Sequence, residues 1–596
     1  MKKTLLLLLA LYSAGASAQM YFSTNSYMYV GDQFVYVTQD VNLQASSNIY
    51  LRRGGQLIQG TTGVSTNQGA GKLSVFQEGN VDNFEYNYWC SPIGNASGGS
   101  GNENFGITMI QRPNGVNTSV PATILPTSSL NGTADSSNLP TSLSIAPRWV
   151  FRYLSDTNYS GWLTNTTGAA TVIEPGQGFT MKGTSGDDTF FSENGVANNP
   201  AGINAQRYDF RGKPNDGNIN ITVMPGKMTL TGNPYPSSIN LRAFLLAETN
   251  CTGIAYFWEQ DKNVNSHVLQ NYQGGYGSYA SGSNIYLAPT FYGYNSAGTQ
   301  LGVVGAGTNY PREFSPVGQG FMIEGASTVL GPVVMSNNRR IFKREGVDTA
   351  FSRPAGTSSE TNSVESDVAP HIRFNILLSE NAVRPLILSF SPLATDGVDR
   401  AFDAKSGGGG GNADCFFPIE GNEYGIAAVN FDINKKVPIA FKSTVAQNFK
   451  ITVSEMVNFS DAQHVYLHDK ITDMYHEIVG GVYEFSLAAG SDTSRYEITF
   501  VDSALGVTEI GDTTFDVLQN NTNQQLEISN PEQVELKSCA LYDMTGKLIF
   551  SKANLGSDVN YTFSTAGLSE GIYIVKLMTA KGQDFGKKIS IFRKEN

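Results

Sequence analysis

The sequence predicts an all-β protein built from several β-sandwich or β-meander modules in series. The first observation is that apolar and polar residues alternate with period two in many short segments, such as "NIYLRR" and "RYEITF". The second is that clusters of Gly, Asn and Ser separate these segments, as turns do. The third is the length of 596 residues, which is too long for one core and, at about 150 residues per domain, indicates three to five domains.

The pattern of strands, turns and linkers divides the chain into successive parts. In order, these are a signal peptide at residues 1–18, an N-terminal short-strand β region at 19–85, a first β module at 86–200, a second β module at 201–345, a linker at 346–369, a β-sandwich at 370–503, a second linker at 504–513 and a small all-β domain at 514–596. The close spacing of the strands in the N-terminal region suits either stacked rungs or a small meander. The first linker is recognised by its Ser, Thr, Glu and Pro content and its few large apolar residues.

The N-terminal residues predict export from the cytoplasm. In "MKKTLLLLLALYSAGASAQ" two lysines precede a short apolar run, and Ala16 and Ala18 form an Ala-x-Ala cleavage site that would leave Gln19 as the first mature residue. We interpret this segment as a secretory signal peptide, because a membrane anchor needs about 20 apolar residues. No later stretch is long and apolar enough to span a bilayer, so we expect no transmembrane segment after signal removal.

The composition argues against one large class of partner. The formal net charge is -12, and only 15% of the residues are charged, whereas glycine alone accounts for 63 residues. A surface that binds nucleic acid needs clustered Lys and Arg to neutralise phosphates, so we expect no nucleic-acid partner.

The four cysteines, Cys90, Cys251, Cys415 and Cys539, lie far apart and form no Cys-x-x-Cys pair. This spacing excludes a zinc knuckle and a dense disulfide framework. A single disulfide stays open as an alternative to four free thiols, and Cys90 with Cys251 is the pair that it would use.

The two β modules are interpreted as copies of one unit. "YNYWCSPIGN" in the first corresponds to "LTGNPYPSSIN" in the second, and "RWVFRYL" corresponds to "IAYFWEQ". Both copies then contain Gly-Gln-Gly-Phe, and Pro92 to Gly176 spans the same 84 residues as Pro234 to Gly318.

The Gly-Gln-Gly-Phe motif has two interpretations, a phosphate-binding loop and a turn that begins a strand. A dinucleotide-binding loop needs a helix after the glycines and a third Gly three residues past the second. Strand-forming residues follow instead, in "GFTMK" and "GFMIE". We therefore expect glycines that adopt positive φ in a tight turn and a Phe that enters the core.

Three segments of the last domain form a recognisable set, namely "LYDMTGKLI", "LSEGIYIVKL" and the basic "GKKISIFRK", in this order near the end of the chain. This set resembles the C-terminal sorting domain of type IX secretion cargo, the export route of Bacteroidetes. One departure is "FDVLQNN" at the position where the family often has Tyr-Pro-Asn-Pro. The positions that match are Leu541, Tyr542, Asp543, Gly546, Lys547, Gly571, Tyr573, Lys587 and Lys588.

The resemblance implies an immunoglobulin-like fold for this domain and two partners, the type IX translocon and its sortase. It also implies that the sortase, a cysteine protease, removes the domain and that the body is then released or attached to surface lipopolysaccharide. Other segments, such as "GNPYPSSIN" and "VYLHDKITDMYHEI", are similar to segments of flavobacterial multidomain surface proteins, most of which have no assigned activity. We therefore expect a secreted protein, or one on the outer cell surface, that passes through the periplasm.

A tyrosine-rich segment at residues 272–294 is the candidate ligand-binding surface, and we expect it to be a loop. Tyrosine offers rigid, amphipathic contact area that can stack on sugar rings or dock a protein. The alternative is that these tyrosines pack on the module's own surface. The candidate residues are Trp258, Tyr272, Tyr276, Tyr279, Tyr286, Tyr292 and Tyr294.

Carboxylates and histidines offer two alternative metal sites. Asp396, Asp399 and Asp403 could hold calcium, but they miss the spacing of a calcium loop, so turn capping is the default interpretation. His464 and His468 share a strand face, for which solvent-facing polar positions on a sheet edge are the simpler interpretation. We predict no metal site and no cofactor, with calcium kept as the alternative.

Three short Asp-Ser/Thr patterns in or beside the predicted linkers resemble O-glycosylation sites of Bacteroidetes proteins. Their acceptors would be Thr349, Ser503 and Thr513.

These observations predict a non-catalytic protein that serves adhesion or binds glycans or other surfaces. The first alternative is a secreted polysaccharide-active enzyme or its accessory binding module, and the second is a structural spacer of the cell surface. We assign no catalytic residue, because neither a Gly-x-Ser-x-Gly elbow nor a P-loop is present. Paired glycosidase carboxylates are recognised only by their distance in space.

Overall fold

The computed structural model describes residues 19–134, 143–345, 367–379, 382–407, 411–502, 515–543, 547–580 and 584–593. It confirms the predicted all-β class, with 52% of the residues in strands. Among the described residues, α2 (Leu241–Ala247) is the one α-helix. The chain forms two compact units: unit 1 comprises the described residues of Met1–Gln463 and Glu477–Ile498, and unit 2 those of His464–His476 and Thr499–Asn596.

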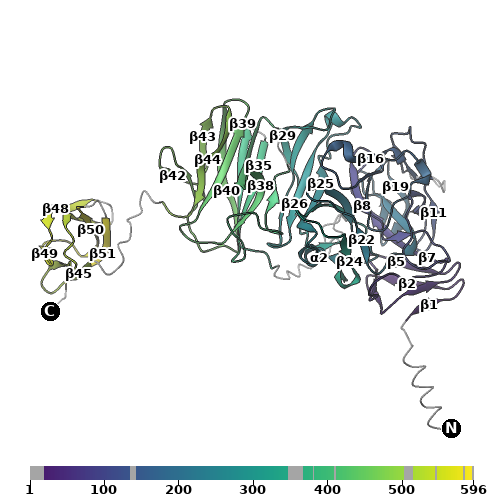
Figure 1. Ribbon diagram of the computed structural model, residues 1–596, viewed down its shortest axis with the longest axis horizontal. Coiled ribbons are helices and arrows are strands. Elements are labelled where there is room, and N and C mark those ends of the chain that lie inside the picture. Colours follow the sequence, from purple (N-terminus) through teal and green to yellow (C-terminus); the bar gives the residue numbers. More distant parts are fainter. Residues whose placement is uncertain are drawn as a thin grey trace, which may run out of the picture. The chain divides into compact units, whose positions relative to one another are not determined.

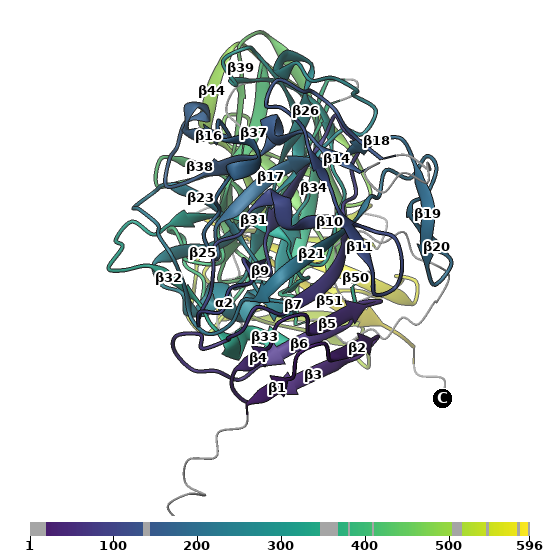
Figure 2. The same cartoon turned by 90° about the vertical axis from the view of Figure 1, so that its right-hand side faces the viewer.

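The N-terminal region of unit 1 is a stack of parallel rungs (Figure 2). Three strands of the first rung pair in parallel with strands of the second: β1 (Met20–Phe22) with β4 (Val41–Leu43), β2 (Tyr27–Gly31) with β5 (Asn48–Arg52), and β3 (Phe34–Val37) with β6 (Gln56–Gln59). The next strand, β7 (Lys72–Glu78), pairs in parallel with β5. Of the two arrangements that the sequence left open, the structure therefore has the stacked rungs.

The corners between these strands recur with the same period as the rungs. Asn25 and Ser46 both have φ 61°, and Asp32 and Arg53 have φ 56° and 51°. Each pair of equivalent corners is 21 residues apart, so a single turn geometry is used twice. Inside the stack, Val30 lies opposite Leu51 and Leu51 opposite Val75, and all three are buried. Aliphatic side chains stacked on one another therefore form the core of this region.

The two β modules have the same strand register, as expected for copies. In the first, β8 (Tyr86–Cys90) pairs with β17 (Gly178–Lys182), and Cys90 lies opposite Gly178. In the second, β23 (Met228–Gly232) pairs with β31 (Gly320–Gly325), and Gly232 lies opposite Gly320.

The Gly-Gln-Gly-Phe motif has the predicted structural role. The first glycines, Gly176 and Gly318, adopt φ 80° and 77°, whereas the second, Gly178 and Gly320, have no positive φ and are the first residues of β17 and β31. Phe179 and Phe321 are fully buried. The motif is therefore a turn that begins a core strand, in both copies.

The two copies contact each other through these motifs. In one direction, Cys90 N donates to Gly318 O at 2.8 Å, beside a bridge between Trp89 and Gln319. In the other, the Thr231 hydroxyl donates to Gly176 O at 2.7 Å. The first strand of each copy thus contacts the Gly-Gln-Gly-Phe turn of the other copy. The glycines allow the two backbones to approach each other closely at these contacts.

The remaining strands of the first copy, and those leading to the second, are mostly short. They are β9 (Ile93–Gly94), β10 (Ile110–Pro113), β11 (Ser119–Pro121), β12 (Thr123–Ile124), β13 (Gly132–Thr133), β14 (Ser144–Ile145), β15 (Phe151–Tyr153), β16 (Trp162–Thr164), β18 (Thr184–Ser185), β19 (Asp188–Glu193), β20 (Val196–Asn199), β21 (Arg207–Pro214) and β22 (Ile219–Ile221). Strand β21 pairs with β7 on one side and with β10 on the other, so the sheet of the rungs continues into the first copy.

The second copy is dominated by one antiparallel sheet with the strand order β23-β31-β25-β26-β28-β29. The further strands of the second copy, some of them in smaller sheets, are β24 (Ser238–Asn240), β25 (Cys251–Gln260), β26 (Gln273–Ala280), β27 (Ile285–Leu287), β28 (Thr290–Tyr294), β29 (Gln300–Ala306), β30 (Phe314–Ser315), β32 (Val333–Met335) and β33 (Arg340–Ile341).

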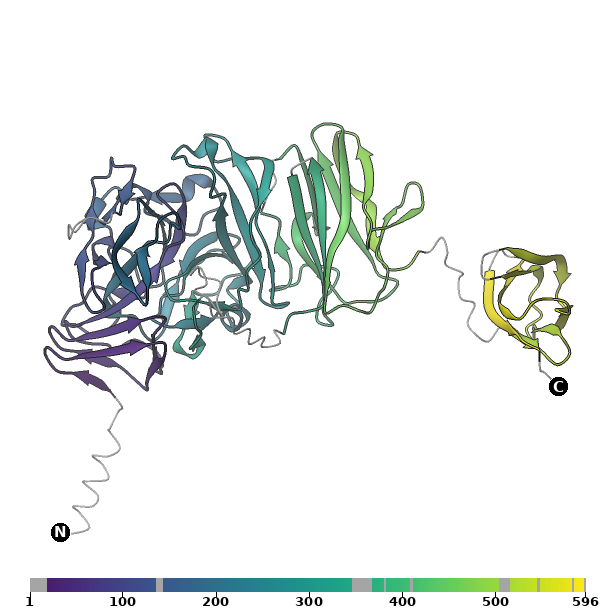
Figure 3. The same ribbon diagram turned by 180° about the vertical axis from the view of Figure 1, so that it is seen from behind.

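The described residues of 367–463 and 477–498, which follow the two copies and which we call the third part of unit 1, pack against this sheet, as the neighbouring teal and green strands in Figure 3 show. Ile387 and Ile426 share a core cluster with Ile254 and Ile285 of the second copy. The strands of this part are β34 (His371–Ser379), β35 (Ala382–Phe390), β36 (Ala404–Lys405), β37 (Ala413–Ile419), β38 (Asn422–Val429), β39 (Lys436–Ser443), β40 (Gln447–Val457), β43 (Tyr483–Leu487) and β44 (Gly490–Thr499). The second copy and the third part therefore bury a common core.

Unit 2 contains a sandwich of seven strands, which is coloured yellow in Figure 1. One sheet has the order β45-β46-β49 and the other β48-β47-β50-β51, and Leu541, Val575 and Leu577 lie fully buried between them. The strands of unit 2 are β41 (Tyr466–Asp469), β42 (Met474–Glu477, whose last residue falls in unit 1), β45 (Asp516–Asn520), β46 (Gln525–Ser529), β47 (Leu536–Asp543), β48 (Leu548–Gly556), β49 (Asn560–Ser564), β50 (Gly571–Thr579) and β51 (Asp584–Ile591).

Candidate functional site

The tyrosine-rich segment at residues 272–294 is not the loop that the sequence suggested. It forms β26, β27 and β28, which belong to the large sheet of the second copy. The expectation of a loop was wrong because the many Gly and Ser residues, which favour loops, lie here between aromatic residues of a buried sheet. Gly274, for example, leaves room for the ring of Trp258.

Three of the candidate tyrosines are part of the protein's own packing. Tyr279 and Tyr286 belong to the core of the second copy together with Phe257. Tyr292 is 2% exposed and accepts a hydrogen bond from Arg384 at 3.0 Å. All three therefore pack within the protein, Tyr279 and Tyr286 inside their own module and Tyr292 partly against Arg384, which lies outside the module.

The other four candidates line one cavity of about 660 Å³. These are Trp258, Tyr272, Tyr276 and Tyr294, from β25, β26 and β28 and the residue before β26. We call this cavity the aromatic cleft. Eleven aromatic side chains line it, and seven of them were not among the candidates: Tyr86, Tyr88, Phe151, Tyr153, Tyr159, Trp162 and Tyr256.

The aromatic cleft lies between the two copies. The hydroxyls of Tyr88 and Tyr276, one from each copy, share a hydrogen bond of 2.7 Å. Tyr88 also packs edge-on against Trp162 at 6.0 Å between ring centroids, and Trp258 against Tyr276 at 5.1 Å. The aromatic landmarks that defined the repeat were a signal for these residues, since "YNYWC" and "FRYL" supply four of the seven.

Polar groups gather at one part of the cleft wall. Glu324 of β31 is 7% exposed and accepts from Lys405 at 2.6 Å. Lys405 and the two residues after it, Ser406 and Gly407, bring the third part of unit 1 into the lining. Glu324 is the one carboxylate among the lining residues of the cleft.

The tyrosine hydroxyls of the cleft stay neutral. Burial raises the pKa of Tyr153 and of Tyr272 to about 12. Tyr153 donates to Asn158 O at 2.8 Å and Tyr294 to Gly274 O at 3.0 Å, so these hydroxyls orient the rings.

A buried lysine stands behind the cleft wall. Lys182 of β17 donates to the Tyr272 hydroxyl at 2.6 Å, and its ammonium lies 4.1 Å from the ring centroid of Trp149 and 4.8 Å from that of Tyr86. Burial lowers the pKa of Lys182 to about 7. The Lys182 side chain thereby fixes Tyr272 and Tyr86, which both line the cleft.

The aspartates considered for calcium cap turns instead. Asp399 accepts from the Thr395 backbone N–H at 2.5 Å, and Asp403 accepts from the N–H groups of Asp399 at 2.6 Å and Ala428 at 2.7 Å. Burial raises the pKa of Asp403 to about 7. Asp396 pairs with Lys435. Among the residues that the structure describes, no cluster of His, Cys, Asp or Glu is placed to hold a metal ion.

The cysteines are four buried free thiols. The disulfide kept open between Cys90 and Cys251 is therefore absent. Burial raises the pKa of the Cys539 thiol to about 12.

The residues of the sorting resemblance lie in the sandwich of unit 2. Leu541, Tyr542 and Asp543 end β47, and Asp543 N donates to Lys547 O at 3.0 Å. Gly571 begins β50, Tyr573 is buried in that strand, and Lys587 and Lys588 lie in β51.

Several predicted positions lie outside the described residues, so the structure says nothing of them. They are Ala16, Ala18, Thr349, Ser503, Thr513 and Gly546. Gln19 is the first described residue and is exposed. In the described part of the chain, no helix has the length and apolar character needed to cross a membrane.

Two family models match the chain, and neither has an assigned function. A model described as "Domain of unknown function (DUF8693)" matches residues 10–500, and one described as "Domain of unknown function (DUF8694)" matches residues 505–591. No curated protein matches the chain.

Solved structures resemble the chain only loosely. CopC from Methylosinus trichosporium OB3b is 20% identical, with a TM-score of 0.10, over 12% of this chain and 79% of that one. The fibronectin(III)-like modules of CbhA from Clostridium thermocellum are 14% identical, with a TM-score of 0.10, over 26% and 87%. The BSP domain of a biofilm associated protein is 9% identical, with a TM-score of 0.12, over 90% and 98%.

Proposed function

Because this chain belongs to the DUF8693 family, to which no function is assigned, we propose from its site that it is a non-catalytic glycan-binding protein. The binding site is the aromatic cleft. The observation on which the proposal rests is that eleven aromatic side chains surround one cavity of about 660 Å³.

Aromatic rings suit carbohydrate for a physical reason. The faces of Tyr, Trp and Phe rings are electron-rich and apolar, and one face of a pyranose ring presents C–H bonds that pack against them. Trp162 and Trp258 are half-buried, and Tyr159 is 49% exposed, so their rings are within reach of a ligand. Glu324, Lys405 and Gln300 are among the polar residues of the lining that would orient sugar hydroxyls.

The size and charge of the cleft support binding over hydrolysis. Its volume falls within the range of about 300 to 1,000 Å³ that is typical of small-ligand sites, which fits a short oligosaccharide. Most glycoside hydrolases need two carboxylates that flank the bond to be cleaved. The lining offers one carboxylate, Glu324, and that group is paired with Lys405.

The two tryptophans of the cleft test this function. We expect Trp258→Ala and Trp162→Ala each to weaken glycan binding by about 10- to 100-fold, because each removes a stacking platform from the site. The measurement is a glycan array with the full chain, followed by calorimetric titration of the best ligand. Tyr21→Ala, which removes a tyrosine 62% exposed in the first rung, is the matched control and should bind like the wild type.

Two results would contradict the proposal. One is that the wild-type chain binds no glycan on a broad array of neutral and acidic sugars. The other is that both tryptophan variants, shown by circular dichroism to be folded, bind with unchanged affinity.

We further propose that type IX secretion exports the protein, with residues 514–596 as the sorting domain. Support comes from the sequence resemblance of this segment and from its separate sandwich in unit 2. The expected mature protein begins at Gln19 and lacks the sorting domain, and it is secreted or held on the cell surface. Intact mass and terminal sequencing of protein recovered from the native host check this, and a mature protein that retains β50 and β51 would refute it.

A further inference from the structure

A second cavity lies on the opposite face of the same sheet. Neighbouring residues of β25 point to opposite faces. Trp258 lines the aromatic cleft, whereas Phe257 packs in the core on the other side. On that side a cavity of about 280 Å³ has Tyr286, Tyr310, Arg312, Glu313 and Arg373 in its lining.

Arg312 is the unusual residue of this cavity. It is 8% exposed, and its guanidinium carbon lies over the rings of Phe257 at 4.1 Å and Tyr286 at 4.9 Å. Its Nε is buried without a hydrogen-bond partner. Among the described residues Arg312 forms no ion pair, and Glu259 attracts it only from a longer distance.

A buried guanidinium without a counter-ion is costly. Taking a charge out of water costs several kcal/mol, and proteins normally offset this with a paired charge or a ligand. The three aromatic contacts of Arg312, which include Tyr310 at 5.2 Å, provide cation–π attraction, and the Tyr286 hydroxyl interacts with the guanidinium, but Nε has no acceptor. The guanidinium is therefore ready to donate to an acceptor that enters the cavity.

Arg373 adds a second positive charge to the lining. Its Nη1 donates to Tyr286 O at 3.3 Å, and its Nε lies 3.4 Å from Glu455, which is outside the lining. Glu313 is the one acidic residue of the lining. The lining therefore carries two guanidinium groups and one carboxylate, while Glu455 and Glu259, which lie outside it, each offset part of this positive charge.

We propose that this cavity is a binding site for a small oxyanion, a carboxylate or sulfate group, separate from the aromatic cleft. The planar fork of Arg312 matches the two oxygens of such a group, and Arg373 neutralises its charge from the rim. The group is either a free anion or part of an acidic sugar, since both offer the same oxygens.

Titration of the full chain with sodium sulfate and with sodium glucuronate tests the site. Sodium chloride at equal ionic strength is the reference, and calorimetry and the unfolding temperature are the readouts. We expect the wild type to bind at least one of the two anions, and Arg312→Met to weaken that binding by about tenfold or more. Without anion, Arg312→Met should unfold at the same or a higher temperature, since an unpaired buried charge has been removed.

Two further variants keep the test decisive. Arg373→Met changes a side chain that is 20% exposed, so it should fold and still bind more weakly than the wild type. Arg148→Met removes an exposed arginine away from the cavity and should leave anion binding unchanged.

Sulfate stabilises most proteins because it is excluded from their surface, so the test compares the effect of sulfate on the wild type with its effect on the variants. The proposal fails if neither anion acts beyond chloride, or if the Arg312 and Arg373 variants respond as the wild type does. Preference for glucuronate over sulfate would identify an acidic sugar as the source, and the reverse a free inorganic anion.

Discussion

We expect Asp216→Asn to destabilise unit 1 by about 3 to 5 kcal/mol, the largest effect of any single change considered for this protein. Asp216 and Arg340 form an ion pair of 3.2 Å in which both side chains are fully buried. The variant keeps the size of the side chain but leaves the guanidinium of Arg340 without its counter-ion. Burial already lowers the pKa of Arg340 to about 10, which shows how strongly the site disfavours an unpaired charge.

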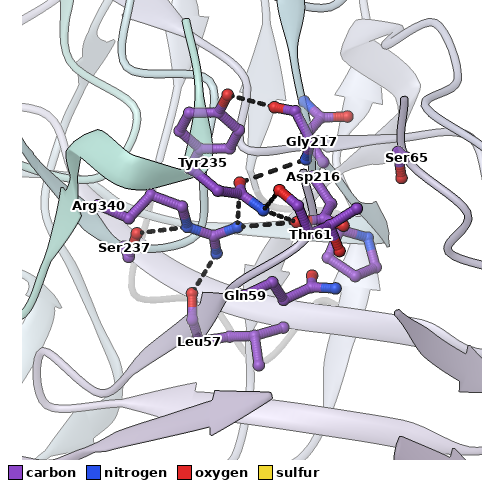
Figure 4. A network of polar contacts seen from close by, with 12 residues as sticks. Leu57, Gln59, Thr61, Ser65, Asp216, Gly217, Tyr235, Ser237 and Arg340 are labelled. Carbon is purple, nitrogen blue, oxygen red and sulfur yellow. Dashed lines mark hydrogen bonds and ion pairs between the residues drawn. The ribbon is translucent and has the colours of Figure 1, made fainter. Parts of the chain in front are cut away.

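The effect should be large because this pair joins three stretches of the chain (Figure 4). Arg340 also donates to Leu57 O in the rungs and to the Ser237 hydroxyl in the second copy. Asn337 donates to Asp216 at 2.6 Å and to Thr61 O at 3.0 Å. Loss of the pair therefore weakens the contact between the rungs and the second copy as well as the pair itself.

Urea denaturation monitored by tryptophan fluorescence measures this change. Asp32→Asn is the matched control, because Asp32 pairs with Arg53 at 3.7 Å on the surface, where an ion pair contributes about 0 to 1 kcal/mol. The double variant Asp216→Asn/Arg340→Met should regain part of the lost stability, since it leaves no unpaired charge. Equal midpoints for the two single aspartate variants would contradict the expectation.

The second large effect is expected from Gly320→Ala, at about 3 kcal/mol. A Cβ at Gly320 would lie 2.7 Å from Trp89 N and 2.7 Å from the carbonyl carbon of Tyr88, both backbone atoms of the other copy. Real Cβ atoms do not approach so closely, so β31 and β8 would have to separate. Tyr88 lines the aromatic cleft, and the same shift should therefore also weaken ligand binding.

Gly302→Ala is the control for this change. Gly302 also lies in a strand, β29, but a Cβ there would meet nothing within 4 Å. Thermal unfolding of both variants measures the difference. A Gly320→Ala protein as stable as the Gly302→Ala protein would show that the two copies are not held at this backbone contact.

Local patterns in the sequence were enough to predict the strands and the key turn. Alternation with period two indicated an all-β chain, and the residues that follow Gly-Gln-Gly-Phe excluded a phosphate loop. Gly176 and Gly318 indeed adopt positive φ, and the next Phe is buried in each case. These features depend on neighbouring residues alone, which is why a single sequence reveals them.

The rungs show a pattern that was present in the sequence and not used. Asn25 and Ser46, like Asp32 and Arg53, are equivalent corners 21 residues apart. A search for a 21-residue period would have distinguished rungs from a meander, since only parallel rungs repeat a corner at constant spacing. The prediction of a loop at the tyrosine-rich segment was wrong for another reason. Gly and Ser favour a loop when they are exposed, but the packing of a sheet can override this preference.

The sequence by itself determined the all-β class, the duplication of the β module and the turn that begins a strand in each copy. The tertiary structure alone decided which aromatic residues form a site and which form the core. Tyr88 and Tyr276 are 188 residues apart and share a hydrogen bond, whereas the adjacent Trp258 and Phe257 differ, since Trp258 lines the cleft and Phe257 packs in the core. Local propensity depends on near neighbours along the chain, but a cleft and a buried charge depend on which distant strands pack together.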